Sequence, residues 1–149
     1  MEMAKITDYL LCTRQITKLH DHYLRQVSGQ YGLTLMEANI ISFLYNNPGC
    51  DTARDIVELR GFSKGNVSNA VESLIRKSLL KRDPDARDRR RIHLSLLPAA
   101  RSVTAEIEKV QTQFREKIFS GFSEEEVKTM NAFAERIRLN TLSEQKEGK

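Results

Sequence analysis

Apolar residues recur at helical spacing in three long segments near the two ends of the chain. No glycine or proline interrupts Ile6–Val27, and we expect one helix there of roughly five to six turns, ending before Gly29. A second uninterrupted helix is predicted over Pro98–Phe119, with proline at its first position. The capping box Ser123–Glu126 opens a third, and the polar tail after Ser143 is expected to fray.

Shorter elements occupy the middle of the chain. The capping box Thr34–Glu37 precedes a strongly apolar helix, which Asn46–Gly49 should end. A second capped start, Thr52–Asp55, leads a short helix as far as Gly61. Ser63 is then a good N-cap for another helix. Its apolar residues lie on one stripe, formed by Val67, Val71, Leu74 and Ile75.

The hydrophobic period changes from helical to alternating after this helix. Ile92, Leu94 and Leu96 alternate with polar residues, which is typical of a half-buried strand. The preceding segment, 82–91, holds Pro84, three aspartates and five arginines, which favour a turn and supply positive charge. A short helix, a turn, a capped helix and a basic hairpin form the outline of a winged helix-turn-helix. We therefore expect a mainly α fold with a small β-hairpin wing.

Composition narrows the class of protein. At 149 residues, with 40% hydrophobic and 30% charged residues, the chain should form one compact domain. No apolar run approaches the ~18 residues of a transmembrane helix, and no signal-peptide pattern opens the sequence. The sequence thus predicts a cytoplasmic protein with no membrane partner. Cys12 and Cys50 are too few for a disulfide framework or a cysteine-only zinc site.

The positive charge is concentrated in the predicted helix-turn-helix and wing. Between Asp51 and Arg101 the sequence has twelve Lys or Arg and seven Asp or Glu, a net charge of +5, whereas the whole chain carries +4. A localised basic field attracts polyanions and releases their counterions on binding. Charge alone does not separate DNA from RNA or from an acidic protein.

The polar residues of the Ser63 helix favour DNA. Lys64, Asn66, Ser68 and Asn69 lie off its apolar stripe, in the first two turns, and suit phosphate and base-edge contacts. RNA recognition usually adds aromatic stacking platforms, and residues 63–97 contain no Phe, Tyr or Trp. Thr52 and Arg54, at the start of the preceding helix, are further candidates for phosphate contacts.

These features together resemble the MarR family of bacterial transcription regulators. The resemblance covers the long first helix, the YGLT segment Tyr31–Thr34, the helix-turn-helix and the wing with its Asp88-Arg89-Arg90 motif. Two departures affect local geometry only. Where the family often has Leu-Thr-x-x-Gly after the wing, this chain has Leu96–Ala100, and Lys77–Leu79 replaces Lys-Gly-Leu before the first wing strand.

The resemblance implies a homodimer that binds a pseudo-palindromic duplex DNA, usually as a repressor. It implies that Ser63–Asn69 enters the major groove and that Arg90 enters the minor groove. Arg89 and Arg91 are as suited to phosphates as to solvent. It also implies that Asp88 holds the wing loop in shape by pairing with an arginine.

The helical ends carry the other candidate roles. We expect residues 1–30 and 98–149 to form a dimerisation region, and residues 31–97 to form the DNA-binding region. The predicted dimer contacts are Leu10, Leu11, Phe114, Ile118, Phe119, Phe133 and Ile137. The resemblance further implies a pocket for a small aromatic or phenolic ligand, to which His20, Tyr23, Leu35 and Met36 could contribute, although ordinary core or dimer packing explains each of them better.

Several alternatives are weighed against this regulator. His20 and His22, two positions apart on a helix, face different ways and make a poor metal site. No catalytic motif is recognisable, so we expect neither an enzyme nor a cofactor. Two functions stay open beside a ligand-responsive DNA-binding regulator. One is a winged helix used as a protein–protein interaction module, and the other is a thiol-based redox sensor through Cys12 or Cys50.

Overall fold

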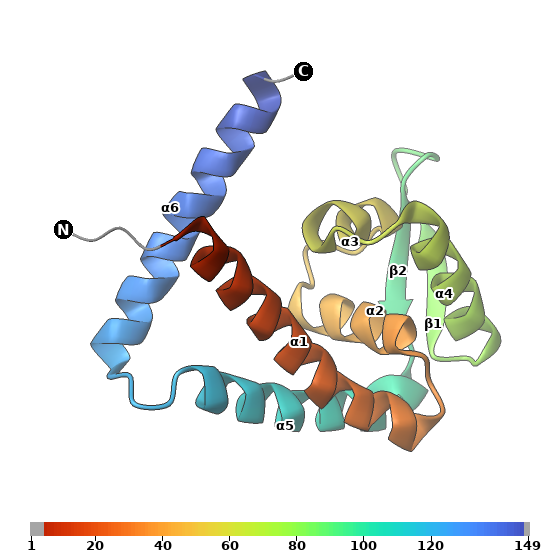
Figure 1. Cartoon of the computed structure of the whole chain (residues 1–149). Helices are drawn as coiled ribbons and strands as arrows, with labels where there is room; N and C mark the ends of the chain where they lie inside the picture. Colours follow the sequence, from red (N-terminus) through yellow and green to blue (C-terminus); the bar gives the residue numbers. More distant parts are fainter. Residues whose placement is uncertain (1–4, 148–149) are drawn as a thin grey trace. The chain divides into compact units, whose positions relative to one another are not determined.

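The computed structural model describes residues 5–147, which form six α-helices, one 3-10 helix and a two-stranded antiparallel sheet (Figure 1). The chain divides into two compact units between Phe114 and Arg115. The first contains the helix-turn-helix and the wing, and the second contains the last helix. This confirms the predicted fold class. Among the described helices, none combines the length and apolar character that a bilayer crossing requires.

The first helix, α1 (Ile6–Tyr31), is longer than predicted. It continues through Gly29 and ends at Gly32, which adopts the left-handed conformation at φ 64°. The N–H groups of Gly32 and Leu33 both donate to the Ser28 carbonyl, so the last turn is capped. Glycine within a helix costs about 1 kcal/mol relative to alanine. Beyond Gly29, Tyr31 packs against the core and Gly32 caps the helix, so the predicted end before Gly29 was wrong.

Helix α2 (Leu35–Asn46) forms the centre of the first unit. Eight consecutive residues, Glu37–Leu44, are buried, because α2 packs against α1, α4 and β2. The predicted capping box is present: Thr34 Oγ1 accepts from the Glu37 N–H at 3.1 Å, and Glu37 Oε1 accepts from the Thr34 N–H at 2.9 Å. Most of these buried residues are apolar, as the sequence predicted, and the buried polar side chains of Glu37, Asn39 and Ser42 form hydrogen bonds.

The helix-turn-helix consists of α3 (Ala53–Arg60) and α4 (Lys64–Arg76). Gly61, at φ 69°, makes the turn between them. Val67, Ala70, Val71 and Leu74 form the buried side of α4, which confirms the predicted stripe. The glycine that the family often has after this helix is Ser78 here, and Ser78 still adopts the left-handed conformation at φ 60°.

The wing is a hairpin of β1 (Leu80–Pro84) and β2 (Ile92–Leu96), with Leu80 opposite Leu96 and Pro84 opposite Ile92. The predicted turn of residues 82–91 is shorter in the structure, because β1 extends to Pro84. Proline is tolerated there since this strand lies at a sheet edge and its end needs no further N–H donor. Leu94 is buried, whereas Ile92 is exposed at one side of the hairpin.

The segment after the wing starts with a 3-10 turn, η1 (Pro98–Ala100), and continues as α5 (Arg101–Ile118). Pro98 is at the first helical position, as predicted, but the first turn is not α-helical. In the second unit, the Ser123 capping box opens α6 (Glu124–Glu147). This helix continues past Ser143, where we had expected the chain to fray.

A buried carboxylate connects three elements of the first unit. Glu37 Oε2 accepts from Ser73 Oγ at 2.9 Å and from Lys77 Nζ at 3.0 Å, while Oε1 receives the Thr34 N–H. Lys77 Nζ also donates to the carbonyl of Gly32, at the end of α1. Burial alone raises the pKa of Glu37, but these hydrogen bonds outweigh burial and hold its pKa below the ordinary value.

We predict that Glu37→Gln destabilises the protein by about 1–3 kcal/mol, because the amide cannot accept all of these hydrogen bonds. Since the pKa of Glu37 is lowered on folding, its contribution is present above the ordinary carboxyl pKa and is lost as pH falls through the folded value. Urea unfolding of the variant should therefore show a smaller stability loss between neutral and acidic pH than the parent protein shows. Glu135→Gln, in an exposed ion pair with Arg138 on α6, is the matched control and should have a much smaller effect, because exposed ion pairs contribute little. Equal effects of the two substitutions would contradict the role of Glu37.

Candidate nucleic-acid interface

The first two turns of α4 present polar side chains to solvent. Ser63 caps the helix by accepting the Asn66 N–H at 3.2 Å, so its hydroxyl has a structural role. Lys64, Asn66, Ser68 and Asn69 are all exposed, and no hydrogen bond from their side chains to another described residue ties them down. These four side chains are therefore available to a partner.

The four polar residues of α4 occupy two sides of the helix. Lys64 and Ser68, one turn apart, border a cleft, whereas Asn66 and Asn69 do not line it. A helix lying in a major groove has base edges below it and phosphates on both flanks. The arrangement therefore offers different side chains to different parts of the groove.

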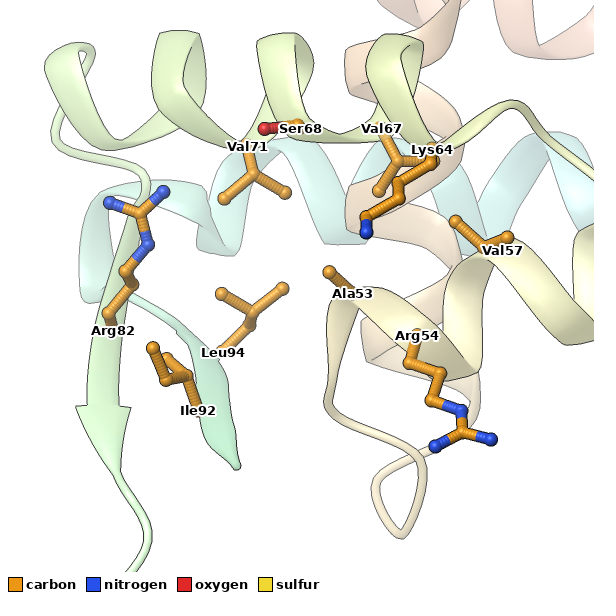
Figure 2. A pocket seen from close by; sticks show the side chains of 10 residues that line it. All are labelled: Ala53, Arg54, Val57, Lys64, Val67, Ser68, Val71, Arg82, Ile92 and Leu94. Atoms are coloured by element: carbon orange, nitrogen blue, oxygen red, sulfur yellow. The ribbon is translucent and has the colours of Figure 1, made fainter. Parts of the chain in front are cut away.

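The cleft lies between α3, α4 and the wing and has a volume of about 460 Å³ (Figure 2). Its rim carries the cationic side chains of Arg54, Lys64 and Arg82. Val67 and Val71 of α4 point toward Leu94 and Ile92 of the hairpin across an apolar floor (Figure 2). Ile92 is exposed because its side chain lines this open cleft.

Thr52 and Arg54 differ in whether their side chains are accessible to DNA. Thr52 is buried and caps α3, with its hydroxyl oxygen accepting the Asp55 N–H at 3.1 Å. Arg54 is exposed and forms an ion pair with Glu58 at 2.8 Å, one turn along the same helix. Exposed pairs of this kind are worth little, so Arg54 can exchange Glu58 for a phosphate at small cost.

Two carboxylates shape the turn of the wing. Asp85 Oδ2 accepts the N–H groups of Arg87 and Asp88, at 3.1 and 2.9 Å. Asp88 Oδ1 in turn accepts the Arg90 N–H at 3.0 Å. Asp88 therefore stabilises the loop through a backbone amide; within residues 5–147 it forms no ion pair with an arginine side chain, which corrects the pairing we had expected.

The wing arginines are free. Arg87, Arg89, Arg90 and Arg91 are exposed, and none forms an ion pair with any residue that the structure describes. The turn that carries them projects from the hairpin beside α3 and α4 (Figure 1). Their charge is therefore unneutralised in the unbound protein, which is the condition for attraction to a polyanion.

Sequence reasoning missed one residue of the wing. His93, which we treated only as a polar strand position, lies between two carboxylates: Nδ1 is 2.7 Å from Asp51 Oδ1 and Nε2 is 2.8 Å from Asp85 Oδ1. Asp51 precedes α3 and is 42 residues away in the chain, and no local pattern links the two positions. The alternation of β2 did show which side of the hairpin His93 occupies.

The side chains suggested for a ligand pocket pack closely and leave no open pocket between them. His20 and Tyr23 both make edge-to-face contacts with Phe114, at centroid distances of 5.4 and 6.5 Å. No water-sized sphere fits in the hollow that they line. Leu35 and Met36 of α2 do not border this hollow and pack against the core instead. Burial, followed by the positive charge of Arg60, lowers the pKa of His20.

Both units expose large apolar side chains. On α1, Leu10 and Leu11 are 64% and 46% exposed; on α6, Phe133 and Ile137 are 50% and 60% exposed. The other candidate contacts, Phe114, Ile118 and Phe119, are partly buried. Of the two thiols, Cys12 is exposed on α1 and Cys50 packs partly against the core.

Comparison with known proteins gives consistent matches. The model of the MarR family matches residues 31–91, which include the helix-turn-helix, the first wing strand and the wing turn. The HTH-type transcriptional regulator YwaE of Bacillus subtilis is 24% identical over 115 residues, or 77% of this chain and 67% of YwaE.

Solved structures share the fold. MepR of S. aureus, in a complex with DNA, is 24% identical and superposes with a TM-score of 0.71, covering 90% of this chain and 96% of MepR. BpsR of Bordetella bronchiseptica, whose DNA binding is regulated by 6-hydroxynicotinic acid, is 20% identical with a TM-score of 0.66, covering 90% and 99% of the two chains.

A capped helix with a polar exposed side, beside a hairpin with free arginines, defines a winged helix-turn-helix of the DNA-binding class. The family match over residues 31–91 then confirms the resemblance found in the sequence: the helix-turn-helix and wing region of this chain matches the MarR family. The coarser function that the match supports is that of a DNA-binding transcriptional regulator.

Proposed function

We propose that this protein is a homodimeric, sequence-specific repressor that binds a pseudo-palindromic duplex DNA and is released from it by a small molecule. The observation that carries the proposal is the polar exposed side of α4, with Asn66 and Asn69, next to the unpaired wing arginines. Phosphate attraction needs only lysine and arginine. Exposed asparagines at a helix start add donors and acceptors that can read base edges.

In the proposed complex, the first two turns of α4 enter the major groove and the wing reaches the adjacent minor groove. Arg90 is the arginine assigned to the minor groove, and Arg89 is assigned to the phosphates. Lys64 and Arg54, on the rim of the cleft, would lie over the sugar-phosphate backbone. MepR, which has the same fold, was solved in a complex with DNA, and this supports DNA as the partner.

Arg90→Ala should weaken binding to a duplex taken from upstream of the protein's own gene by roughly tenfold, because one specific arginine contact is worth about 1–3 kcal/mol. Fluorescence anisotropy at two salt concentrations measures this effect. The parent protein should bind this duplex at least about a thousandfold more tightly than a scrambled one. Arg25→Ala, an exposed arginine of α1, is the matched control and should leave the affinity nearly unchanged.

Equal, salt-sensitive binding to both duplexes would reject sequence-specific recognition and leave only a basic surface. The winged helix would then be better explained as a module that binds an acidic protein.

The exposed apolar side chains of α1 and α6 support a homodimer. Contiguous exposed apolar surface on a protein usually marks an interaction site, and most oligomers of identical chains are twofold symmetric. A twofold dimer would present two α4 helices to successive major grooves, roughly 34–36 Å apart. A pseudo-palindromic operator is the DNA that such a dimer fits.

Ile137→Glu should weaken self-association at least about tenfold, because a charge placed in an apolar interface loses its hydration. Sedimentation velocity over a range of protein concentrations measures the dimer dissociation constant. Asn131→Glu adds the same charge about a third of a turn away around α6 and should leave the dimer intact. A dimer unaffected by both substitutions would show that this part of α6 lies outside the interface.

We propose that a small aromatic or phenolic ligand acts by population shift, favouring a separation of the two α4 helices that no longer fits successive grooves. A coupling free energy of about 1–3 kcal/mol lowers DNA affinity roughly five- to over a hundredfold. The control of BpsR by 6-hydroxynicotinic acid supports such a ligand. No open pocket lies between His20, Tyr23 and Phe114, so a ligand there would have to displace their packing.

This mechanism is tested with the Arg76→Cys variant, in which Cys12 and Cys50 are changed to serine. A nitroxide is attached at position 76 of each protomer, and the distance between the two nitroxides is measured by electron paramagnetic resonance. With 6-hydroxynicotinate and 4-hydroxybenzoate as probes, a compound that releases DNA should also change the distance between the two labels. The same distance in the free, DNA-bound and compound-bound forms would rule out the mechanism.

A further inference from the structure

His93 connects two parts of the DNA-binding region that are far apart in the sequence. Its ring lies between Asp51, just before α3, and Asp85, the residue that organises the wing turn. The Asp51 carbonyl also accepts the Leu94 N–H at 2.7 Å, so the loop before α3 is held to β2 by the backbone as well. The attachment of the turn to this loop, in contrast, depends on the side chain of His93.

The hydrogen-bond chemistry determines the protonation state of this site. An ionised carboxylate only accepts hydrogen bonds, and a neutral imidazole has a single N–H. Both contacts, at 2.7 and 2.8 Å, are satisfied together only when both ring nitrogens carry a proton. The two contacts therefore require an imidazolium.

The other charged groups on this side of the hairpin do not compete for His93. Asp83 lies opposite His93 on β1, but it is paired with Lys81 at 3.5 Å and accepts a weak hydrogen bond from Ser95. Within residues 5–147, no lysine or arginine forms an ion pair with Asp51 or Asp85. His93 is thus the cation that these two carboxylates share.

We propose that His93 is a positioning residue for the wing: its imidazolium ties Asp85 to Asp51 and thereby holds Arg90 where it can meet the minor groove, so that loss of one proton from His93 weakens DNA binding. The role rests on the proposed DNA-binding function and acts through Arg90. His93 itself need not touch DNA.

The direction of the pH dependence follows from the contacts. Hydrogen bonds to Asp85 and then to Asp51 raise the pKa of His93 above the ordinary histidine value. A raised pKa means that the connection is fully present below about pH 6.5 and is lost as pH rises through the raised value. His93, followed by the Asp88 and Arg87 N–H groups, lowers the pKa of Asp85, so this carboxylate stays ionised throughout.

Deprotonation leaves one N–H to serve two carboxylates. The backbone hydrogen bond between Asp51 and Leu94 does not titrate and keeps its side of the site in place. The turn then loses its fixed attachment, and the N–H groups of Arg87 and Asp88 depend on an Asp85 side chain that is no longer oriented by His93. Disorder in the turn would spread the positions of Arg90 and raise the entropy cost of binding.

The first experiment uses no DNA. Nitrogen-15 NMR of the imidazole rings, between about pH 5.5 and about pH 9, should show a doubly protonated His93 that titrates above the ordinary histidine value of about 6.5. Asp85→Asn and Asp51→Asn should each lower the pKa of His93. In the parent protein, the protection factors of the wing-turn backbone amides, which correct for base-catalysed exchange, should fall above the pKa of His93. A His93 that titrates at or below the ordinary histidine value in all three proteins would overturn the proposal.

The second experiment measures affinity for the upstream duplex by anisotropy at the same two extremes of pH. Affinity should fall with rising pH, by at most about tenfold per pH unit, the limit for one coupled proton. His93→Gln should bind weakly at both pH values and match the parent protein at high pH, whereas His22→Gln should behave like the parent throughout. Circular dichroism on each variant confirms that it is folded.

A double-mutant cycle separates positioning from simple charge. If His93 acts through Arg90, His93→Gln should have no further effect in an Arg90→Ala chain. If the imidazolium only adds positive charge near DNA, the effect of His93→Gln should be the same in both chains, and the positioning role is overturned. If the protein shows no specific binding at either pH, the proposed DNA recognition is overturned as well. If it binds specifically and the affinities of the parent and of His93→Gln depend on pH in the same way, only the role of His93 is overturned.

Discussion

The buried carboxylate of Glu37 is the interaction on which the arrangement of the DNA-binding region depends. It accepts a backbone N–H at the start of α2, a hydroxyl from α4 and the ammonium of Lys77, which also reaches the end of α1. A buried charge is costly unless its hydrogen bonds are complete, so these partners cannot drift independently. These hydrogen bonds fix the orientation of α4 relative to α1 and α2. The direction in which the polar side of α4 faces is fixed with it.

The wing follows a different principle, because it is attached by few groups at its edge rather than through the core. Leu80 and Leu94 bury its base. Backbone hydrogen bonds from the Asp85 N–H to the Arg91 carbonyl and from the Arg91 N–H to the Asp88 carbonyl close the turn. Three side chains, the carboxylates of Asp85 and Asp88 and the ring of His93, hold it further. All three lie near the surface, where hydrogen bonds and ion pairs are individually worth little. These contacts order the turn sufficiently to position its arginines. They are also weak enough that loss of one proton from His93 can change the conformation of the turn.

The sequence predicted those features that neighbouring residues decide. The caps at Thr34, Thr52, Ser63 and Ser123 are all present, because an N-cap needs only a side chain and a backbone amide three residues away. The end of α1 was misplaced, since the packing of Tyr31 and the cap at Gly32 outweighed the local preference of Gly29. The exposed residues of α4 were found correctly because its apolar stripe left them no other side of the helix.

What the sequence could not supply was the pairing of ionisable groups across the fold. Lys77 lies 40 residues from Glu37, and His93 lies 42 residues from Asp51; both pairs form only because α2, α4 and the hairpin meet. In each case one local contact was visible and its distant partner was not: the capping box placed Glu37, and the strand alternation placed His93. The resemblance to a family likewise located the wing but assigned Asp88 the wrong partner, because the same loop shape can be held by a backbone amide as well as by an arginine side chain. Distant polar pairs are therefore where this fold departs most from what its local patterns specify, and they are also the contacts that position both parts of the proposed DNA-binding surface.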